Sequence, residues 1–80
     1  GLGDVYKRQD RLRSLIERIE RLEEEKKAIA GDIRDIFAEA KSAGFDVKVM
    51  REILKLRKMD AADRDEKELL LETYRKALEI

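Results

Sequence analysis

Residues 12–40, LRSLIERIERLEEEKKAIAGDIRDIFAEA, decide the fold, because apolar residues recur in them at alternating spacings of three and four. This spacing is a heptad repeat, whose positions are lettered a to g, and we assign Leu12 to position a. Four heptads keep one phase, which predicts a left-handed coiled coil. The a and d positions form a seam made of Leu12, Leu15, Ile19, Leu22, Lys26, Ile29, Ile33, Ile36 and Ala40.

Three residues modify this seam. Lys26 occupies an a position, where a polar residue lowers stability but helps to specify register and strand number. Alternatively, the stem of Lys26 packs in the seam while its ammonium group reaches out to water. Ile16 and Phe37 fall at e positions and widen the apolar seam near its two ends.

The seam needs a partner chain. The segment from Asp10 to Ala43 has no Pro and one Gly, and as a helix it would be roughly 50 Å long. The whole chain has 80 residues, of which 42% are hydrophobic and four are aromatic, so it is too small to cover such a helix. It has no Cys and no His, which excludes a disulfide and the usual thiolate zinc sites. We therefore expect an oligomer.

The same composition argues against an enzyme. The commonest nucleophile and the commonest general base are absent, and Ser14, Ser42 and Thr73 have no apparent partner group. We expect no catalytic residue, no metal, no cofactor and no small-molecule substrate. No run of about 18 apolar residues is present, so we expect a cytoplasmic protein without a membrane partner. Residues 1–9 fit no later periodicity, and we interpret them as a non-native or disordered leader.

Two shorter helices are predicted after the coiled coil. Gly44 has the position of a helix C′ residue, and Asp46 can cap a second helix from about Val47 to Lys58. Asp63 is the expected cap of a third helix, from about Arg64 to Glu79, although one bent helix is the alternative. The predicted fold is all-α, with a coiled-coil helix over 10–43 and a basic helix and a C-terminal helix over 44–80, in one domain covering 10–80.

Basic residues gather in one part of a neutral chain. The sequence has 19 basic and 19 acidic residues, yet 41–58 holds six basic and two acidic ones, a net charge of +4. Such segregation is typical of a site for a polyanion, while a solvated face or pairing with an acidic partner is an equal alternative. One face of the second helix carries Lys48, Arg51, Lys55 and Lys58 with Arg57 beside them, and b positions of the coiled coil carry Lys27, Arg34 and Lys41.

Three stretches carry a family resemblance: IERIERLEEEKK at 16–27, AEAKSAGFDVK at 38–48 and LRKMD at 56–60. Over about residues 12–80 the chain resembles the GapR family of small bacterial nucleoid-associated proteins. The second stretch is the specific one, because Glu-rich coiled-coil sequence is common. The chain departs from the family pattern at 60–65, DAADRD, where relatives tend to be more basic.

The resemblance implies an all-helical homo-oligomer, a coiled-coil dimer that pairs into a dimer of dimers and encloses double-stranded DNA in a basic channel. It implies a preference for AT-rich, overtwisted DNA, read through shape and backbone. The channel positions of the family match Arg34, Lys41, Lys48, Arg51 and Lys58, with Lys27, Lys55 and Arg57 as neighbours. From the residues alone, a coiled-coil module that docks an acidic protein through its basic face stays open as the alternative.

Overall fold

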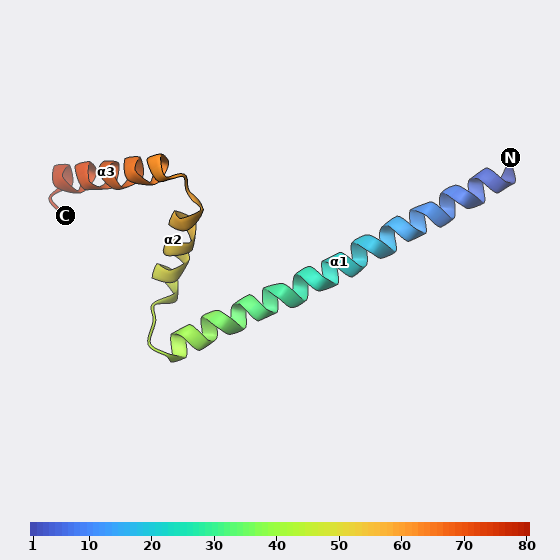
Figure 1. Ribbon diagram of the computed structural model, residues 1–80, viewed down its shortest axis with the longest axis horizontal. Helices are drawn as coiled ribbons and strands as arrows, with labels where there is room; N and C mark the ends of the chain where they lie inside the picture. The colour runs from blue at the N-terminus through green and yellow to red at the C-terminus, as the bar shows by residue number, and fades with distance from the viewer. The chain divides into compact units, whose positions relative to one another are not determined.

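The computed structural model describes residues 1–80 and contains three α-helices and no strand (Figure 1). The helices are α1, Leu2–Ser42, α2, Val47–Lys58, and α3, Ala61–Leu78. This confirms the all-α fold with a long first helix. The chain divides into two compact units, Gly1–Glu39 and Ala40–Ile80. The single domain over 10–80 and the oligomeric state stay predictions.

Helix α1 begins earlier than the predicted start near Asp10. It starts at Leu2, and the ammonium group of Gly1 donates a hydrogen bond of 3.2 Å to the Asp4 carboxylate in the first turn. An acidic residue in the first turn suits the positive end of the helix dipole, and no Pro interrupts the stretch. The structure therefore shows helix over 2–9, in the segment interpreted from the sequence as a non-native or disordered leader. The foreign origin of residues 1–9 stays a prediction.

The end of α1 is fixed by a Schellman motif. The Phe45 N–H donates to the Ala40 carbonyl at 3.0 Å, and the Gly44 N–H donates to the Lys41 carbonyl at 3.0 Å. These two bonds satisfy carbonyl groups that the helix leaves unpaired. Gly44 has φ +92°, a left-handed conformation that glycine adopts without strain. The predicted C′ role of Gly44 is confirmed.

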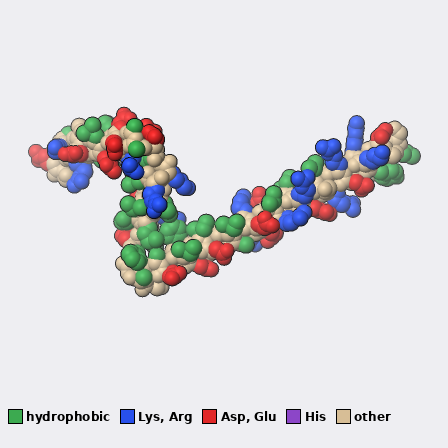
Figure 2. Space-filling view, in the orientation of Figure 1, with side chains coloured by type: hydrophobic (Ala, Val, Ile, Leu, Met, Phe, Trp, Pro, Cys, Tyr) green, Lys and Arg blue, Asp and Glu red, His purple; other side chains and the backbone are tan.

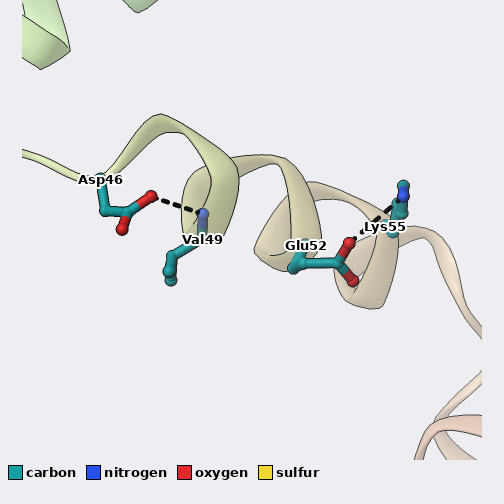
Figure 3. A network of polar contacts seen from close by, with 4 residues as sticks. All are labelled: Asp46, Val49, Glu52 and Lys55. Carbon is teal, nitrogen blue, oxygen red and sulfur yellow. Dashed lines mark hydrogen bonds and ion pairs between the residues drawn. The ribbon is translucent and has the colours of Figure 1, made fainter.

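Helix α2 begins and ends at its predicted residues. The Asp46 carboxylate accepts a hydrogen bond of 3.1 Å from the backbone N–H of Val49, as Figure 3 shows. This contact satisfies one of the free N–H groups of the first turn. The N-cap role of Asp46 and the range Val47–Lys58 are both confirmed.

The predicted start of α3 is wrong by one turn. The cap is Asp60, whose carboxylate accepts a hydrogen bond of 3.2 Å from the Ala62 N–H, and the helix starts at Ala61. Asp63 becomes an acidic residue of the first turn. Met59 and Asp60 have extended ψ values of 148° and 144°, so α2 and α3 are separate helices and not one bent helix. Ala61 and Ala62 have high helix propensity, which favours the earlier start.

Neither unit contains a buried residue. In α1, the seam residues Leu22, Ile29 and Ile36 are 62%, 58% and 62% exposed. Hydrophobic side chains are visible at the surface along the helices in Figure 2, with charged side chains between them. On α2 the sequence predicts a buried apolar face made of Val49, Met50, Ile53, Leu54 and Leu56. In the structure Met50 and Leu56 are half-buried, and the other three residues are exposed. Side-chain burial within the single chain therefore contributes little to the stability of its helices.

The two glycines near the end of α1 give a matched test of this local geometry. Gly44→Ala should destabilise the protein by about 1–2 kcal/mol, because an Ala side chain is strained at φ +92°. Gly31→Ala should stabilise it by up to about 1 kcal/mol, because Gly31 is helical and an added Cβ would lie 3.6 Å from Arg34 Nη2, an ordinary contact. Urea unfolding followed by circular dichroism measures both, and shifts of the same sign would contradict this explanation.

Candidate nucleic-acid interface

Four basic residues of α2 share one face of the helix. Successive helical residues turn by about 100°, so the four fall within a sector of about 80°. Apolar residues such as Val49, Ile53 and Leu56 lie on the opposite side. The last turn of α2 is basic, which suits the negative end of the helix dipole. We call this set the α2 basic face: Lys48, Arg51, Lys55 and Lys58.

Arg57 does not belong to the α2 basic face. The helix turns it about 140° from the centre of that face, among the apolar positions of Met50, Ile53 and Leu54. The interpretation that Arg57 lies beside the four basic residues is therefore wrong. Arg57 is adjacent to Lys58 in sequence, but neighbouring residues of a helix point in directions about 100° apart.

An acidic residue, Glu52, contacts the α2 basic face. Lys55 Nζ lies 3.3 Å from Glu52 Oε1, and the two side chains are 69% and 59% exposed (Figure 3). An exposed pair of this kind contributes roughly 0–1 kcal/mol, so a phosphate can compete for Lys55. No carboxylate lies within ion-pair distance of Lys48 or Lys58. The Glu52 contact was not predicted, although a spacing of three residues on a helix would have indicated it.

A shallow hollow of ≈ 340 Å³ follows the same surface of α2. Its lining residues include three members of the α2 basic face, together with Val49 and Glu52. The hollow is open to solvent and three of its five lining residues are basic, so it suits an extended anionic chain better than an enclosed small molecule.

A second basic face lies on α1. We call Lys27, Arg34 and Lys41 the α1 basic face; they are seven residues apart, so each lies about 10.5 Å further along the helix and about 20° round it. None of the three has an ion-pair partner. Between Lys27 and Lys41 the residues on this side of the helix are small or aromatic: Ala30, Gly31, Phe37 and Ala38. Toward the N-terminus, Glu23 and Glu24 lie one turn before Lys27 on the same side.

Gly31 affects the position of Arg34. A side chain at Gly31 would meet Arg34 Nη2 at 3.6 Å, so the guanidinium group lies back over the glycine. The heptad pattern did not single out Gly31. A lone Gly inside a helix costs about 1 kcal/mol relative to Ala and was the available signal.

Between Lys27 and Lys41 the acidic residues of α1 lie elsewhere on the helix. Asp32, Asp35 and Glu39 occupy g and c positions, away from the α1 basic face. Nearer the N-terminus, Lys26 Nζ lies 3.1 Å from Glu23 Oε2, and the Lys26 side chain is 76% exposed. In the single chain the ammonium group of Lys26 therefore points to a carboxylate at the seam's edge.

No group of three or more carboxylates is placed to hold a metal ion. None of the three helices is both long enough and apolar enough to cross a membrane.

Comparisons with known proteins match the chain to a family of DNA-binding domains. Residues 8–79 match the family model described as GapR-like, DNA-binding domain. A UPF0335 protein of Afipia carboxidovorans is 61% identical over 70 residues, which cover 88% of this chain and 79% of that protein. A UPF0335 protein of Rhodopseudomonas palustris is 63% identical, with coverage of 88% and 78%. One from Bradyrhizobium sp. BTAi1 is 64% identical over 69 residues, with coverage of 86% and 76%. No solved structure matches.

The family match spans nearly the whole chain, including α2 and most of α1, and the relatives share well over half of their aligned residues with it. The description of the family supports DNA binding by this chain. The relatives described above are named UPF0335 proteins. The chain belongs to the GapR-like DNA-binding domain family.

Proposed function

We propose that this protein binds double-stranded DNA through the phosphate backbone, as a nucleoid-associated protein of the bacterial cytoplasm. The observation that carries the proposal is the pair of basic faces, on α1 and on α2, in a chain that belongs to a DNA-binding family. We propose binding without catalysis or cofactor. The proposed contacts are those of Lys27, Arg34, Lys41, Lys48, Arg51, Lys55 and Lys58; Arg57, on the other side of α2, is a weaker candidate.

The residue types favour recognition of DNA shape over base reading. Phosphate contacts by Lys and Arg set affinity and position but carry no sequence information. Adenine is commonly read by Asn or Gln side chains. The chain has no Asn, and its only Gln, Gln9, lies outside both faces. A preference for AT-rich or overtwisted DNA would then arise from groove width and deformability.

Self-association is the second part of the proposal. The seam is an uninterrupted apolar strip apart from Lys26, and its side chains are exposed in the single chain. Burying one large aliphatic side chain contributes about 1.5–3 kcal/mol, so the strip strongly favours pairing. We propose a homodimer through this seam, and a dimer of dimers that clamps or encloses DNA. The residues proposed for the dimer are Leu12, Leu15, Ile19, Leu22, Lys26, Ile29, Ile33 and Ile36.

Neutralising the α2 basic face should weaken DNA binding across all sequences. In the variant Lys48→Gln, Arg51→Gln, Lys58→Gln, we expect lower affinity for random duplex DNA. The log-log slope of affinity against salt should be smaller by about 0.9 for each phosphate that the variant no longer neutralises. Fluorescence anisotropy over a range of salt concentrations measures both quantities. Circular dichroism should show an unchanged helix content.

The matched control replaces three arginines outside both faces, Arg8, Arg21 and Arg75, with Gln. If this control weakens binding as much, the basic faces are not the binding site. If the unaltered protein shows no DNA binding even at low salt, a module that docks an acidic protein becomes the better interpretation. Failure to bind scrambled duplexes of equal composition would instead indicate base contacts, each of which discriminates by about 1–3 kcal/mol.

Association through the seam predicts a melting temperature that rises with protein concentration. Ile29→Asp should then abolish the dimer, because the carboxylate would lie unpaired in the seam at a cost of several kcal/mol. In a lone chain the same change would cost little, since Ile29 is 58% exposed there. Ala28→Asp, one residue away at a c position, is the control for helix propensity. A monomeric mass at micromolar concentration, with a melt independent of concentration, would exclude self-association.

A further inference from the structure

We infer that the Glu52 carboxylate competes with DNA phosphate for the cations of the α2 basic face, and that it thereby limits the affinity and the lifetime of the complex. The inference rests on the proposed function and concerns the regulation of the same site. Glu52 is the only acidic residue of α2, and it lies next to the cations of the face.

Glu52 lies between two of these cations along the helix. It follows Lys48 by four residues and precedes Lys55 by three, and residues at these spacings are neighbours on a helix surface. At about 100° per residue, Glu52 is turned about 40° from Lys48 and about 60° from Lys55. It also lines the shallow hollow of ≈ 340 Å³ together with three members of the α2 basic face. A phosphate group that enters this hollow therefore comes close to a carboxylate.

In the free chain, Glu52 occupies a place that a phosphate oxygen would take at Lys55. Lys55 Nζ donates a hydrogen bond of 3.3 Å to Glu52 Oε1, as Figure 3 shows. A carboxylate and a phosphate are both anions that accept charge-assisted hydrogen bonds from an ammonium group, so they compete for the same cation. DNA therefore gains less from Lys55 than from Lys48 or Lys58, which have no ion-pair partner.

The contact is also weak enough for DNA to displace it. The side chains of Lys55 and Glu52 are 69% and 59% exposed, and an exposed pair is stabilised only weakly. Two anions beside one ammonium group lie within the Debye length of about 8 Å, so physiological salt does not remove their repulsion. Glu52 therefore lowers the affinity twice, because it must give up Lys55 and because it repels the phosphate that arrives there.

The α1 basic face has no equivalent contact. Arg34 and Lys41 have no ion-pair partner, and the acidic residues between Lys27 and Lys41 lie on other sides of the helix. The two basic faces therefore differ in how readily they give up a phosphate. Exchange should begin at the α2 basic face.

The carboxylate also makes release easier. A protein that binds duplex DNA through phosphate contacts exchanges among many similar sites. When a phosphate leaves Lys55, Glu52 can replace it from the neighbouring turn of the helix, so the cation regains an anionic partner at once. Dissociation is then faster than it would be from a face made of cations alone.

The variant Glu52→Gln tests the inference in the full chain, because Gln keeps the side-chain length and the helix propensity but removes the charge. The Kd for random duplex DNA at physiological salt should fall by about threefold to fivefold, chiefly through slower dissociation. The slope of log affinity against log salt should steepen by up to about 0.9, the value for one more phosphate neutralised. Fluorescence anisotropy and stopped-flow dissociation measure these quantities.

The matched control is Glu72→Gln on α3. Glu72 Oε1 lies 3.0 Å from Lys76 Nζ in another exposed pair, outside both basic faces, so this variant makes the same change in net charge. Its Kd should stay within about twofold of that of the unaltered chain. Equal gains from the two variants would overturn the inference, because net charge alone would explain them. Weaker binding by Glu52→Gln would also overturn it, since Glu52 would then position Lys55 for DNA.

The variant Lys55→Gln identifies the cation for which Glu52 competes. In that background, Glu52→Gln should improve the Kd by less than about twofold, because the two residues act as a coupled pair. An undiminished gain would overturn competition at Lys55. If neither the unaltered chain nor Glu52→Gln binds duplex DNA at low salt, the proposed function itself is wrong, so the two failures are distinguishable. Circular dichroism of each variant should show an unchanged helix content.

Discussion

An apolar strip on one face of a long helix is shielded from water only when another apolar surface packs against it, and this constraint governs the molecule. The seam of α1 spans residues 12–40 of a helix of 41 residues, and its large apolar side chains are exposed in the single chain. Isolated helices gain little stability from their own hydrogen bonds, and most helical stability in proteins comes from packing of the apolar face. In the proposed oligomer, the free energy that orders α1 would come largely from association. Folding and assembly would then be two descriptions of one equilibrium.

The polar contacts in the chain have a different role from that of the apolar seam. The capping bonds at Asp46 and Asp60 and the Schellman motif at Gly44 determine where helices start and stop. Each such cap contributes about 0.5–2 kcal/mol, which is enough to fix a boundary and far too little to fold a chain. Local contacts thus define the helices, while apolar contacts between chains would supply the stability.

Features set by local chemistry were predictable from the sequence. Gly44, Asp46 and the range Val47–Lys58 follow from residues within one turn of each boundary, and all were predicted correctly. The start of α3 was not, because Asp60 and Asp63 both have cap spacing and the choice depends on the extended conformation of Met59 and Asp60. Propensity alone does not decide between two such neighbouring carboxylates.

The candidate site was likewise predictable to the extent that helix geometry fixes it. Spacing grouped the four residues of the α2 basic face correctly, whereas Arg57 was grouped wrongly because adjacency in sequence was taken for adjacency on the helix. The position of Arg34 over Gly31 depends on a side-chain conformation that no spacing rule describes.

The two proposed interactions differ in their response to salt, and this difference has a functional consequence. Phosphate contacts by lysine and arginine weaken steeply as salt rises, because binding releases counterions from the DNA. An apolar seam is not weakened in this way, and the flanking exposed charges contribute little to it. A rise in ionic strength would therefore release DNA while the protein stays assembled. Since a dimer would carry twice as many basic faces as a single chain, assembly would also steepen the dependence of DNA binding on salt. The seam would then set how sharply the protein responds to ionic strength, although no seam residue need contact DNA.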